Sequence, residues 1–223
     1  MKLHTYPDRD LLYAGLADAM ASSLAGALNH GERASLAVPG GTSPGPVFDL
    51  LSGLSLDWAR VDVLLTDERW VDEDSARSNT RLLRERLLVD RAAAARLIPL
   101  HAPTETPEES LGALEGAVRA VLPLDVLLLG MGEDMHTASL FAGADKLTTA
   151  LSPNAPVLVA MRAPGAPEPR VTLSAPVLNG AMAKFLLITG AAKREALERA
   201  RALPAEEAPI AAVLDGLEVH WAP

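Results

Sequence analysis

Residues 35–51 read SLAVPGGTSPGPVFDLL, and this stretch decides the fold class. It begins with a short apolar run at 35–38, continues through a loop of glycine, proline and hydroxyl residues at 39–44, and ends in a helix-compatible pattern at 47–51. A buried strand, a tight loop and a helix in this order form the repeating unit of parallel α/β sheets. The stretch therefore predicts an α/β fold.

The same pattern returns along the chain. Helical periodicity occurs at 8–29, where Asp8 is placed to cap the first turn, and again at 82–88. Near-continuous apolar strands that alternate with helices are typical of a parallel sheet covered on both faces. Four further apolar runs, each ending in polar or glycine-containing sequence, lie at 61–66, 125–129, 157–160 and 185–189.

We therefore expect one α/β domain, residues 1–223, with an open, mostly parallel Rossmann-like sheet and helices on both faces. The proline-rich stretch at 163–170 reads as a surface loop. The Ala- and Arg-rich stretch at 91–96 reads as a solvated helix.

The composition narrows the class of protein. The chain carries 29 acidic and 20 basic residues, a formal net charge of −9, which disfavours binding to nucleic acid or to an anionic membrane. There is no cysteine, and His4, His30, His101 and His220 are scattered without metal-ligand spacing, so we expect no metal site. No uncharged apolar stretch is long enough to cross a bilayer, and the first ten residues do not resemble a signal peptide. We expect a soluble, cytoplasmic protein.

In an open α/β sheet, ligands bind beyond the carboxyl ends of the strands, so the residues after each apolar run are the candidates for a site. Gly41, Thr42 and Ser43 follow the first run and precede a helix, where N–H groups and hydroxyls could cradle a phosphate. An ordinary turn between strand and helix explains these residues equally well. Their spacing matches neither a P-loop nor a dinucleotide-binding loop.

Charged residues follow two other runs. Asp67, Glu68 and Arg69 come directly after the second run, and an arginine there can grip a phosphate through two parallel hydrogen bonds while the aspartate positions the ligand. A solvated strand end with a local Asp–Arg pair is the alternative. Lys193 opens a late helix, where the helix dipole disfavours a cation, which favours a functional role. Arg170 could face the same site or lie on the surface.

The third run leads into GMGEDMHTASLF at 130–141. Its two glycines allow a tight turn, and Asp134 lies two residues before His136. A lone histidine is more often structural, but one at a strand end beside a carboxylate favours a catalytic role. Ser43 and Ser139 lack the Gly-x-Ser-x-Gly context, which disfavours covalent serine catalysis.

Taken in order, these segments resemble the 6-phosphogluconolactonase family, within the broader group that also contains glucosamine-6-phosphate deaminase. HTASLF behind Gly-x-Gly-x-Asp is the part specific to the lactonases, because relatives of the deaminase type continue from the histidine with Ile-Ala-Phe-Asn-Glu. The chain has Met135 and Ala142 where the family usually has Gly and Pro. The other matching segments are GGTSP at 40–44, TDERWV at 66–71, SN at 78–79, RVTL at 170–173 and TGAAK at 189–193.

The resemblance implies an open α/β fold and the hydrolysis of 6-phosphoglucono-δ-lactone to 6-phosphogluconate, without a cofactor, in the pentose phosphate pathway. It implies His136 as general base beside Asp134. The alternatives are an amino-sugar-phosphate deaminase or isomerase and a non-catalytic sugar-phosphate sensor. The implied substrate and phosphate contacts are Gly41, Thr42, Ser43, Asp67, Arg69, Arg170 and Lys193.

Met135 leads to one structural expectation. If the backbone at this position needs a positive φ, a methionine there costs roughly 1–2 kcal/mol. The sequence therefore predicts a loop shape different from that of relatives with glycine.

Overall fold

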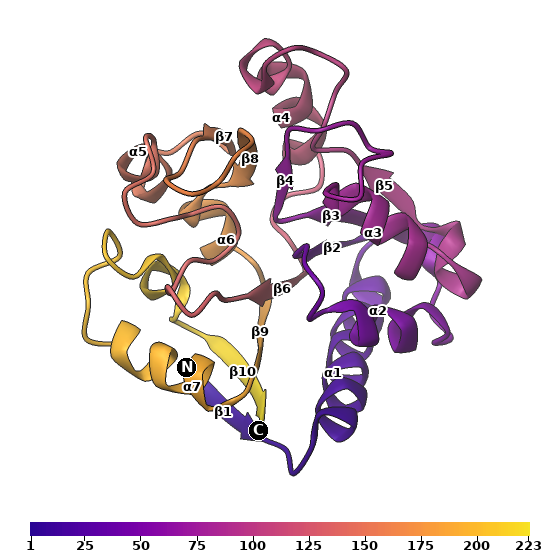
Figure 1. Cartoon of the computed structure of the whole chain (residues 1–223). Coiled ribbons are helices and arrows are strands. Elements are labelled where there is room, and N and C mark those ends of the chain that lie inside the picture. Colours follow the sequence, from indigo (N-terminus) through magenta and orange to yellow (C-terminus); the bar gives the residue numbers. More distant parts are fainter.

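Two β-sheets organise the chain, and the computed structural model describes all residues from 1 to 223 (Figure 1). The larger sheet has seven strands in the order β1-β10-β9-β6-β2-β3-β5, and all of its neighbouring pairs are parallel. This arrangement confirms the predicted open, parallel α/β sheet. The strands are β1 (Lys2–Thr5), β2 (Ala34–Val38), β3 (Val61–Leu65), β5 (Arg96–Ile98), β6 (Val126–Gly130), β9 (Ala183–Thr189) and β10 (Leu217–Ala222).

Helices cover both faces of the larger sheet. Figure 1 shows α1, α2 and α3 on one side of it and α5, α6 and α7 on the other. One cluster of 57 buried apolar residues fills the space between these layers. The helices are α1 (Arg9–His30), α2 (Gly45–Ser52), α3 (Asn79–Arg86), α4 (Leu111–Arg119), α5 (Leu147–Leu151), α6 (Ala175–Asn179) and α7 (Ala191–Ala200).

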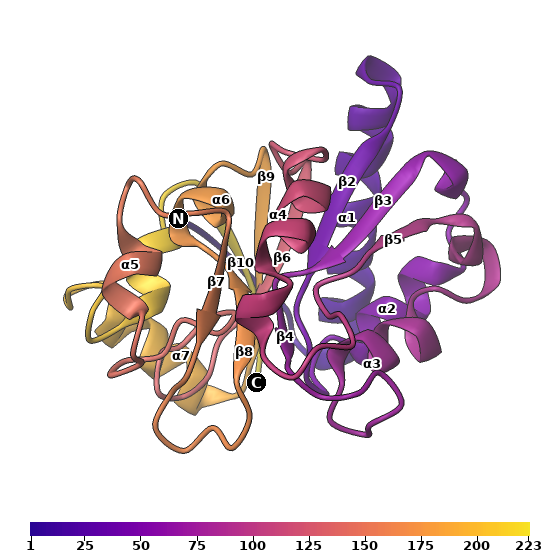
Figure 2. The same cartoon turned by 90° about the horizontal axis from the view of Figure 1, so that it is seen from above.

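The smaller sheet is antiparallel, with the order β4-β8-β7 (Figure 2). It is formed by β4 (Asp67–Arg69), β7 (Leu158–Met161) and β8 (Arg170–Leu173). The expectation that 157–160 belongs to the parallel sheet is therefore wrong. The proline-rich connection at 162–169 is the predicted loop, but it is too short for the dozen or more residues that a parallel crossover needs. It closes a hairpin instead.

Helix α1 is capped as predicted, because the Asp8 carboxylate accepts a hydrogen bond from the Leu11 N–H at 2.8 Å. Its 22 residues have a mean hydropathy of 1.4 in the most apolar window, which by length and composition alone would suit a membrane span. One face of the helix is nevertheless buried in the core through Leu12, Leu16 and Met20. That burial accounts for its apolar character without a membrane.

Several short elements were not expected from the sequence. Strand β1 forms one edge of the larger sheet and pairs in parallel with β10. The stretch at 91–96 is largely exposed, as expected, but it is not an α-helix: it forms a 3-10 helix, Asp90–Ala94, followed by strand β5. Ala92 is its one fully buried residue and packs into the core.

A buried carboxylate joins strands β3 and β5. Asp62 is 3 % exposed, and its oxygens accept three hydrogen bonds from Arg33 and two from Arg96, at 2.6 to 3.1 Å. Burial alone would raise the pKa of Asp62, but the two guanidinium groups outweigh burial and lower it. The carboxylate is therefore charged throughout the neutral range.

Replacing Asp62 with Asn is expected to lower the free energy of unfolding by about 2 kcal/mol, because charge-assisted hydrogen bonds are lost. The lowered pKa means that this stabilisation is fully present above pH ~4 and is lost as the pH falls through the pKa of the folded state. Urea unfolding at pH 7 and pH 3 measures both effects. Asp57→Asn is the control, because Asp57 is 55 % exposed in its pair with Arg60. An equal loss in both variants would contradict the prediction.

Candidate active site

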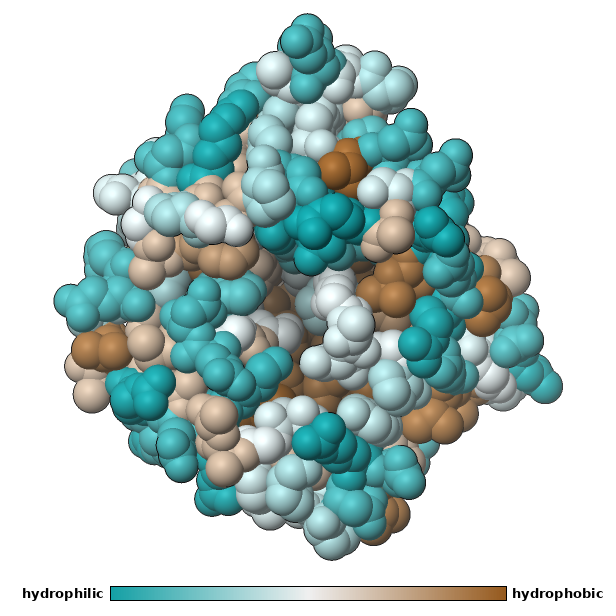
Figure 3. Space-filling model, viewed as in Figure 1, coloured by the Kyte–Doolittle hydropathy of each residue, from teal (hydrophilic) through white to brown (hydrophobic).

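A pocket opens at the carboxyl ends of the central strands β2, β6 and β9, where ligands bind in sheets of this kind. The space-filling view shows the hollow near the middle of this face, with hydrophilic side chains around it (Figure 3). Its lining combines residues from both sheets and from the loops that follow them. The 17 lining residues are Pro39, Gly40, Gly41, Ser43, Pro44, Asp67, Arg69, Asn79, Leu129, Gly130, Met131, Gly132, His136, Ala138, Arg170, Leu187 and Lys193.

Most of the predicted site residues meet in this pocket. Two do not line it: Thr42 is exposed on the loop before α2, and Asp134 stands behind His136. Gly41 has a φ of 85°, which turns the loop so that Gly41 and Ser43, but not Thr42, reach the cavity. The predicted residues that line the pocket are Gly41, Ser43, Asp67, Arg69, His136, Arg170 and Lys193.

His136 and Asp134 form a hydrogen-bonded pair. The Nδ1 atom of His136 lies 2.5 Å from Oδ1 of Asp134, and the His136 backbone N–H donates to the same oxygen at 3.3 Å. Burial would raise the pKa of Asp134, but the hydrogen bond and charge of His136 outweigh it and lower that pKa. A carboxylate partner holds the proton on Nδ1, so that Nε2 is the nitrogen free to accept a proton.

Phe141 packs against the face of the His136 imidazole. Its ring stacks on His136, with centroids 4.3 Å apart and an interplanar angle of 27°. The guanidinium of Arg170 lies over the same phenyl ring, 5.2 Å from its centroid. Phe141 therefore sets the position of the histidine and of one pocket cation at once.

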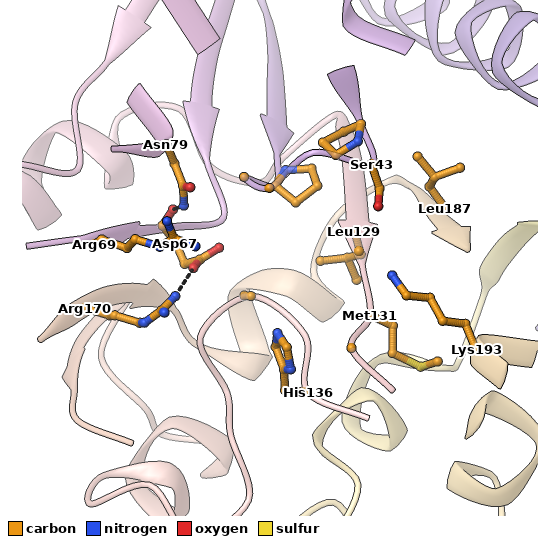
Figure 4. A pocket seen from close by; sticks show the side chains of 17 residues that line it. Ser43, Asp67, Arg69, Asn79, Leu129, Met131, His136, Arg170, Leu187 and Lys193 are labelled. Atoms are coloured by element: carbon orange, nitrogen blue, oxygen red, sulfur yellow. Dashed lines mark hydrogen bonds and ion pairs between the residues drawn. The ribbon is translucent and has the colours of Figure 1, made fainter. Parts of the chain in front are cut away.

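Asp67 anchors the opposite wall of the pocket (Figure 4). It is 6 % exposed, and Ser139 donates a hydrogen bond to its Oδ2 at 2.6 Å, while Nη1 of Arg170 lies 3.8 Å from the same atom. Asn79 donates to the Asp67 backbone carbonyl at 3.0 Å. This network joins the start of β4, the start of α3, the loop after β6 and strand β8.

Three cations of the pocket keep hydrogen-bonding capacity. The Nε atoms of Arg69 and Arg170 are buried and have no hydrogen-bond partner. Burial lowers the pKa of Arg170, although Asp67 opposes this, and both arginines remain charged at any physiological pH. Lys193 takes part in no ion pair. Buried donors without partners and a free ammonium group in one cavity are features that suit the binding of an anion.

Comparison with known proteins agrees with this geometry. The model of the family described as glucosamine-6-phosphate isomerases/6-phosphogluconolactonase matches residues 7–221. The chain belongs to this family.

Relatives named 6-phosphogluconolactonase share much of the sequence. One from Rhizobium meliloti (strain 1021) is 42 % identical, with 99 % of this chain and 98 % of the relative covered. One from Pseudomonas aeruginosa is 41 % identical, with 94 % and 90 % covered. The crystal structure of a 6-phosphogluconolactonase from Shewanella baltica OS155 superposes with a TM-score of 0.96 at 34 % identity and covers 100 % of this chain and 98 % of that one.

The loop after β6 has a left-handed turn at Met135, whose φ is 66°. The methionine itself adopts the positive φ, and the expected difference in loop shape from relatives with glycine stays a prediction. The methionine backbone is held on both sides: the Met135 N–H donates to the Gly132 carbonyl at 3.0 Å, and its carbonyl accepts from the Ile210 N–H at 3.0 Å. These bonds offset the strain of a side chain in this conformation.

Glu68 belongs to the motif but not to the pocket. Successive side chains of a strand point to opposite faces, so β4 turns Asp67 and Arg69 toward the cavity and Glu68 away from it. The Glu68 carboxylate, fully buried, accepts hydrogen bonds from the N–H groups of Asn79 and Thr80 at the start of α3. It caps that helix and is not available as a base.

Sequence reasoning quoted Asn79 and Phe141 in the family motifs without assigning them a role. Asn79 is 6 % exposed and approaches Gly40 so closely that a Cβ there would collide with its side-chain amide. The sequence feature that could have indicated this contact is the glycine pair at 40–41, because a glycine allows close approach of another group. For Phe141 no local sequence pattern indicates its contact with Arg170, because Arg170 lies on the distant strand β8.

Gly132 leaves room for the Asp134–His136 pair. A Cβ at this position would collide with Oδ1 of Asp134 and with the His136 ring. Gly132→Ala is therefore expected to displace the imidazole and to lower the kcat of lactone hydrolysis by roughly 10- to 100-fold, with a much smaller change in KM. Steady-state assays measure this split.

The matched control is Gly112→Ala in helix α4, where an added Cβ meets nothing within 4 Å. That variant should keep the kcat of the unmodified protein and gain slightly in stability. If Gly132→Ala also kept full kcat, the imidazole would not need the geometry described above.

Proposed function

We propose that this protein hydrolyses 6-phospho-D-glucono-1,5-lactone to 6-phospho-D-gluconate, the lactone-opening step of the pentose phosphate pathway, in the cytoplasm and without a cofactor. The observation that carries the proposal is the Asp134–His136 pair, which presents a free imidazole nitrogen in a pocket that also holds unpaired cations. A base beside an anion site is what a phosphorylated lactone requires.

In the proposed reaction, Nε2 of His136 takes a proton from a water molecule as its oxygen attacks the lactone carbonyl. The C–O bond to water forms and the carbonyl oxygen becomes an oxyanion. When the oxyanion collapses, the bond from the carbonyl carbon to the ring oxygen breaks, and the protonated imidazole donates its proton to that oxygen. Asp134 stays ionised throughout, because its pKa is lowered, and stabilises the imidazolium.

Arg69 and Lys193 are the proposed phosphate ligands, together with the loop at Gly41 and Ser43. Figure 4 shows the two cations on opposite walls of the pocket, Arg69 beside Asp67 and Lys193 beside Met131. Binding the phosphate away from the base orients the lactone carbonyl toward His136. The free energy of phosphate binding is thus used to position the reacting group. Arg170 contacts the substrate from the Asp67 wall in this proposal.

The isomerase or deaminase alternative needs a carboxylate that moves a proton between two carbons. Asp67 is the carboxylate that lines the pocket. Its Oδ1 and Oδ2 already accept hydrogen bonds from Thr66 at 3.1 Å and from Ser139 at 2.6 Å. Both oxygens are therefore already engaged by protein donors and are not free to carry a proton between two carbons, which favours hydrolysis.

The deciding experiment is a coupled assay that follows lactone disappearance above the spontaneous opening of the lactone. We expect saturable hydrolysis of 6-phosphogluconolactone, and no release of ammonia or formation of ketose from glucosamine 6-phosphate. If the protein turned over glucosamine 6-phosphate but not the lactone, the deaminase or isomerase function would replace the proposed one. Binding of both compounds without any turnover would replace it by the sensor.

A further inference from the structure

A cluster of potential metal ligands lies outside the pocket, on the edge of the larger sheet. Strands β1 and β10 pair in parallel, with Lys2 opposite Glu218 and His4 opposite His220. Residues directly opposite each other point to the same face, as do residues two apart on one strand. His4, Glu218 and His220 therefore share one face, and none of them lines the active-site pocket.

The three side chains are close enough to share an ion. Each offers one ligand atom, and these atoms all lie within 4.8 Å of one another. Nε2 of His4 is 2.7 Å from Oε2 of Glu218, and the rings of His4 and His220 are stacked with centroids 4.7 Å apart. Lys2 approaches the same carboxylate at 4.0 Å, but it is 70 % exposed and free to move into solvent.

His220 supplies a second, independent observation. It is 2 % exposed, and its Nε2 is buried without a hydrogen-bond partner, although buried polar atoms are almost always paired. Its other nitrogen, Nδ1, lies 2.9 Å from the Tyr6 hydroxyl. When Nδ1 donates its proton to Tyr6, Nε2 carries the lone pair that can bind a metal ion. A metal-ligating histidine is usually held in this way by a hydrogen bond from its second nitrogen.

The short hydrogen bond between His4 and Glu218 explains those two residues without an ion, but it leaves Nε2 of His220 unexplained.

We propose that His4, Glu218 and His220 bind a divalent cation of the Zn²⁺ class through Nε2, a carboxylate oxygen and Nε2, respectively, with water as the fourth ligand. In a tetrahedral zinc site, neighbouring ligand atoms lie about 3.3 Å apart. The three side chains have to rotate to bring ligand atoms that lie within 4.8 Å of one another to that spacing. Two imidazoles and a carboxylate are ligands that suit zinc rather than magnesium or calcium. The ion joins the N-terminal strand to the C-terminal strand and has no part in the reaction.

Sequence inspection excluded a metal site because its ligands are not near one another in the chain. His4 and Glu218 are 214 residues apart. Only the pairing of β1 with β10 brings them together.

Isothermal titration with ZnCl₂ at pH 7.5, in a buffer that does not chelate metals, tests the proposal. The full chain is expected to bind one Zn²⁺ with micromolar or tighter affinity, and saturating Zn²⁺ should raise its melting temperature. His4→Ala and Glu218→Gln should each weaken binding at least tenfold and abolish the shift in melting temperature. His4 and Glu218 are partly exposed, so both variants should fold, which circular dichroism without metal verifies.

Two matched variants separate this site from others. His30→Ala removes an exposed histidine at the end of α1 and should leave binding unchanged. His136→Asn removes the active-site imidazole and should also keep the one-to-one binding. Lactone hydrolysis by His4→Ala should equal that of the unmodified protein. Absence of Zn²⁺ binding up to 1 mM, or a loss of less than tenfold in either His4→Ala or Glu218→Gln, overturns the proposal.

Discussion

The His136→Asn variant is expected to lower the background-corrected kcat by about 10²–10⁴-fold, the usual contribution of a positioned general base. Asparagine keeps much of the shape of the imidazole and can still face Asp134, but it cannot accept a proton. Binding of 6-phosphogluconate, measured by calorimetry, should stay within a few-fold of the unmodified protein, because the pocket cations are untouched. The loss therefore falls on kcat and not on ligand binding.

The pH profile identifies the base independently. With a histidine base, kcat/KM should fall on the acid side as the imidazole takes up a proton. Asp134 is ionised there, since its pKa is lowered, and it accepts a hydrogen bond from Nδ1 of His136. Asp134→Asn should therefore reduce kcat, because the imidazole loses the carboxylate that orients it. If His136→Asn hydrolysed the lactone at the original rate, Asp67 would be the next candidate, since Glu68 caps helix α3.

The strand-end argument was sufficient for much of the candidate site. Residues that follow buried parallel strands must emerge at one edge of the sheet, so Gly41, Asp67 and His136 were predicted to meet without knowledge of any distance. The placement of Lys193 followed from the same rule for β9. The rule applies because buried strands can be recognised in the sequence as apolar runs, and because all strands of a parallel sheet run in the same direction.

The same reasoning could not assign strands to sheets. Residues 157–160 form an apolar run like those of the central strands, yet β7 pairs with β8 in the smaller sheet. Periodicity reports burial, and burial is the same in either sheet. Contacts between distant segments could not be predicted from the sequence either, because they depend on tertiary pairing that leaves no local pattern. Examples are the contacts of Phe141 with Arg170 and of His4 with His220.

Removal of the proposed phosphate ligands is expected to give the second large effect. Arg69→Ala and Lys193→Ala should each raise KM roughly 10- to 100-fold, as a charge-assisted contact of about 1.5–3 kcal/mol is lost. kcat should change less, because His136 and Asp134 remain in place. For Arg69 the loss includes a guanidinium whose Nε has no partner in the protein and whose Nη1 donates to the Arg77 carbonyl at 2.9 Å.

Because Arg69 and Lys193 come from opposite walls of the pocket, the double variant tells whether they share the phosphate. If both cations bind the same group, the effect of replacing Lys193 should differ between the unmodified protein and the Arg69→Ala variant. The double-mutant cycle then gives an interaction energy above ~0.5 kcal/mol. Additive losses would mean that one cation binds the phosphate and the other contacts the sugar ring. Inorganic phosphate as a competitive inhibitor separates these two cases, since its inhibition constant should rise only in the variant that lacks a true phosphate ligand. If neither variant changed KM or that inhibition constant, the phosphate would have to bind elsewhere, and Arg170 would be the remaining pocket cation to replace.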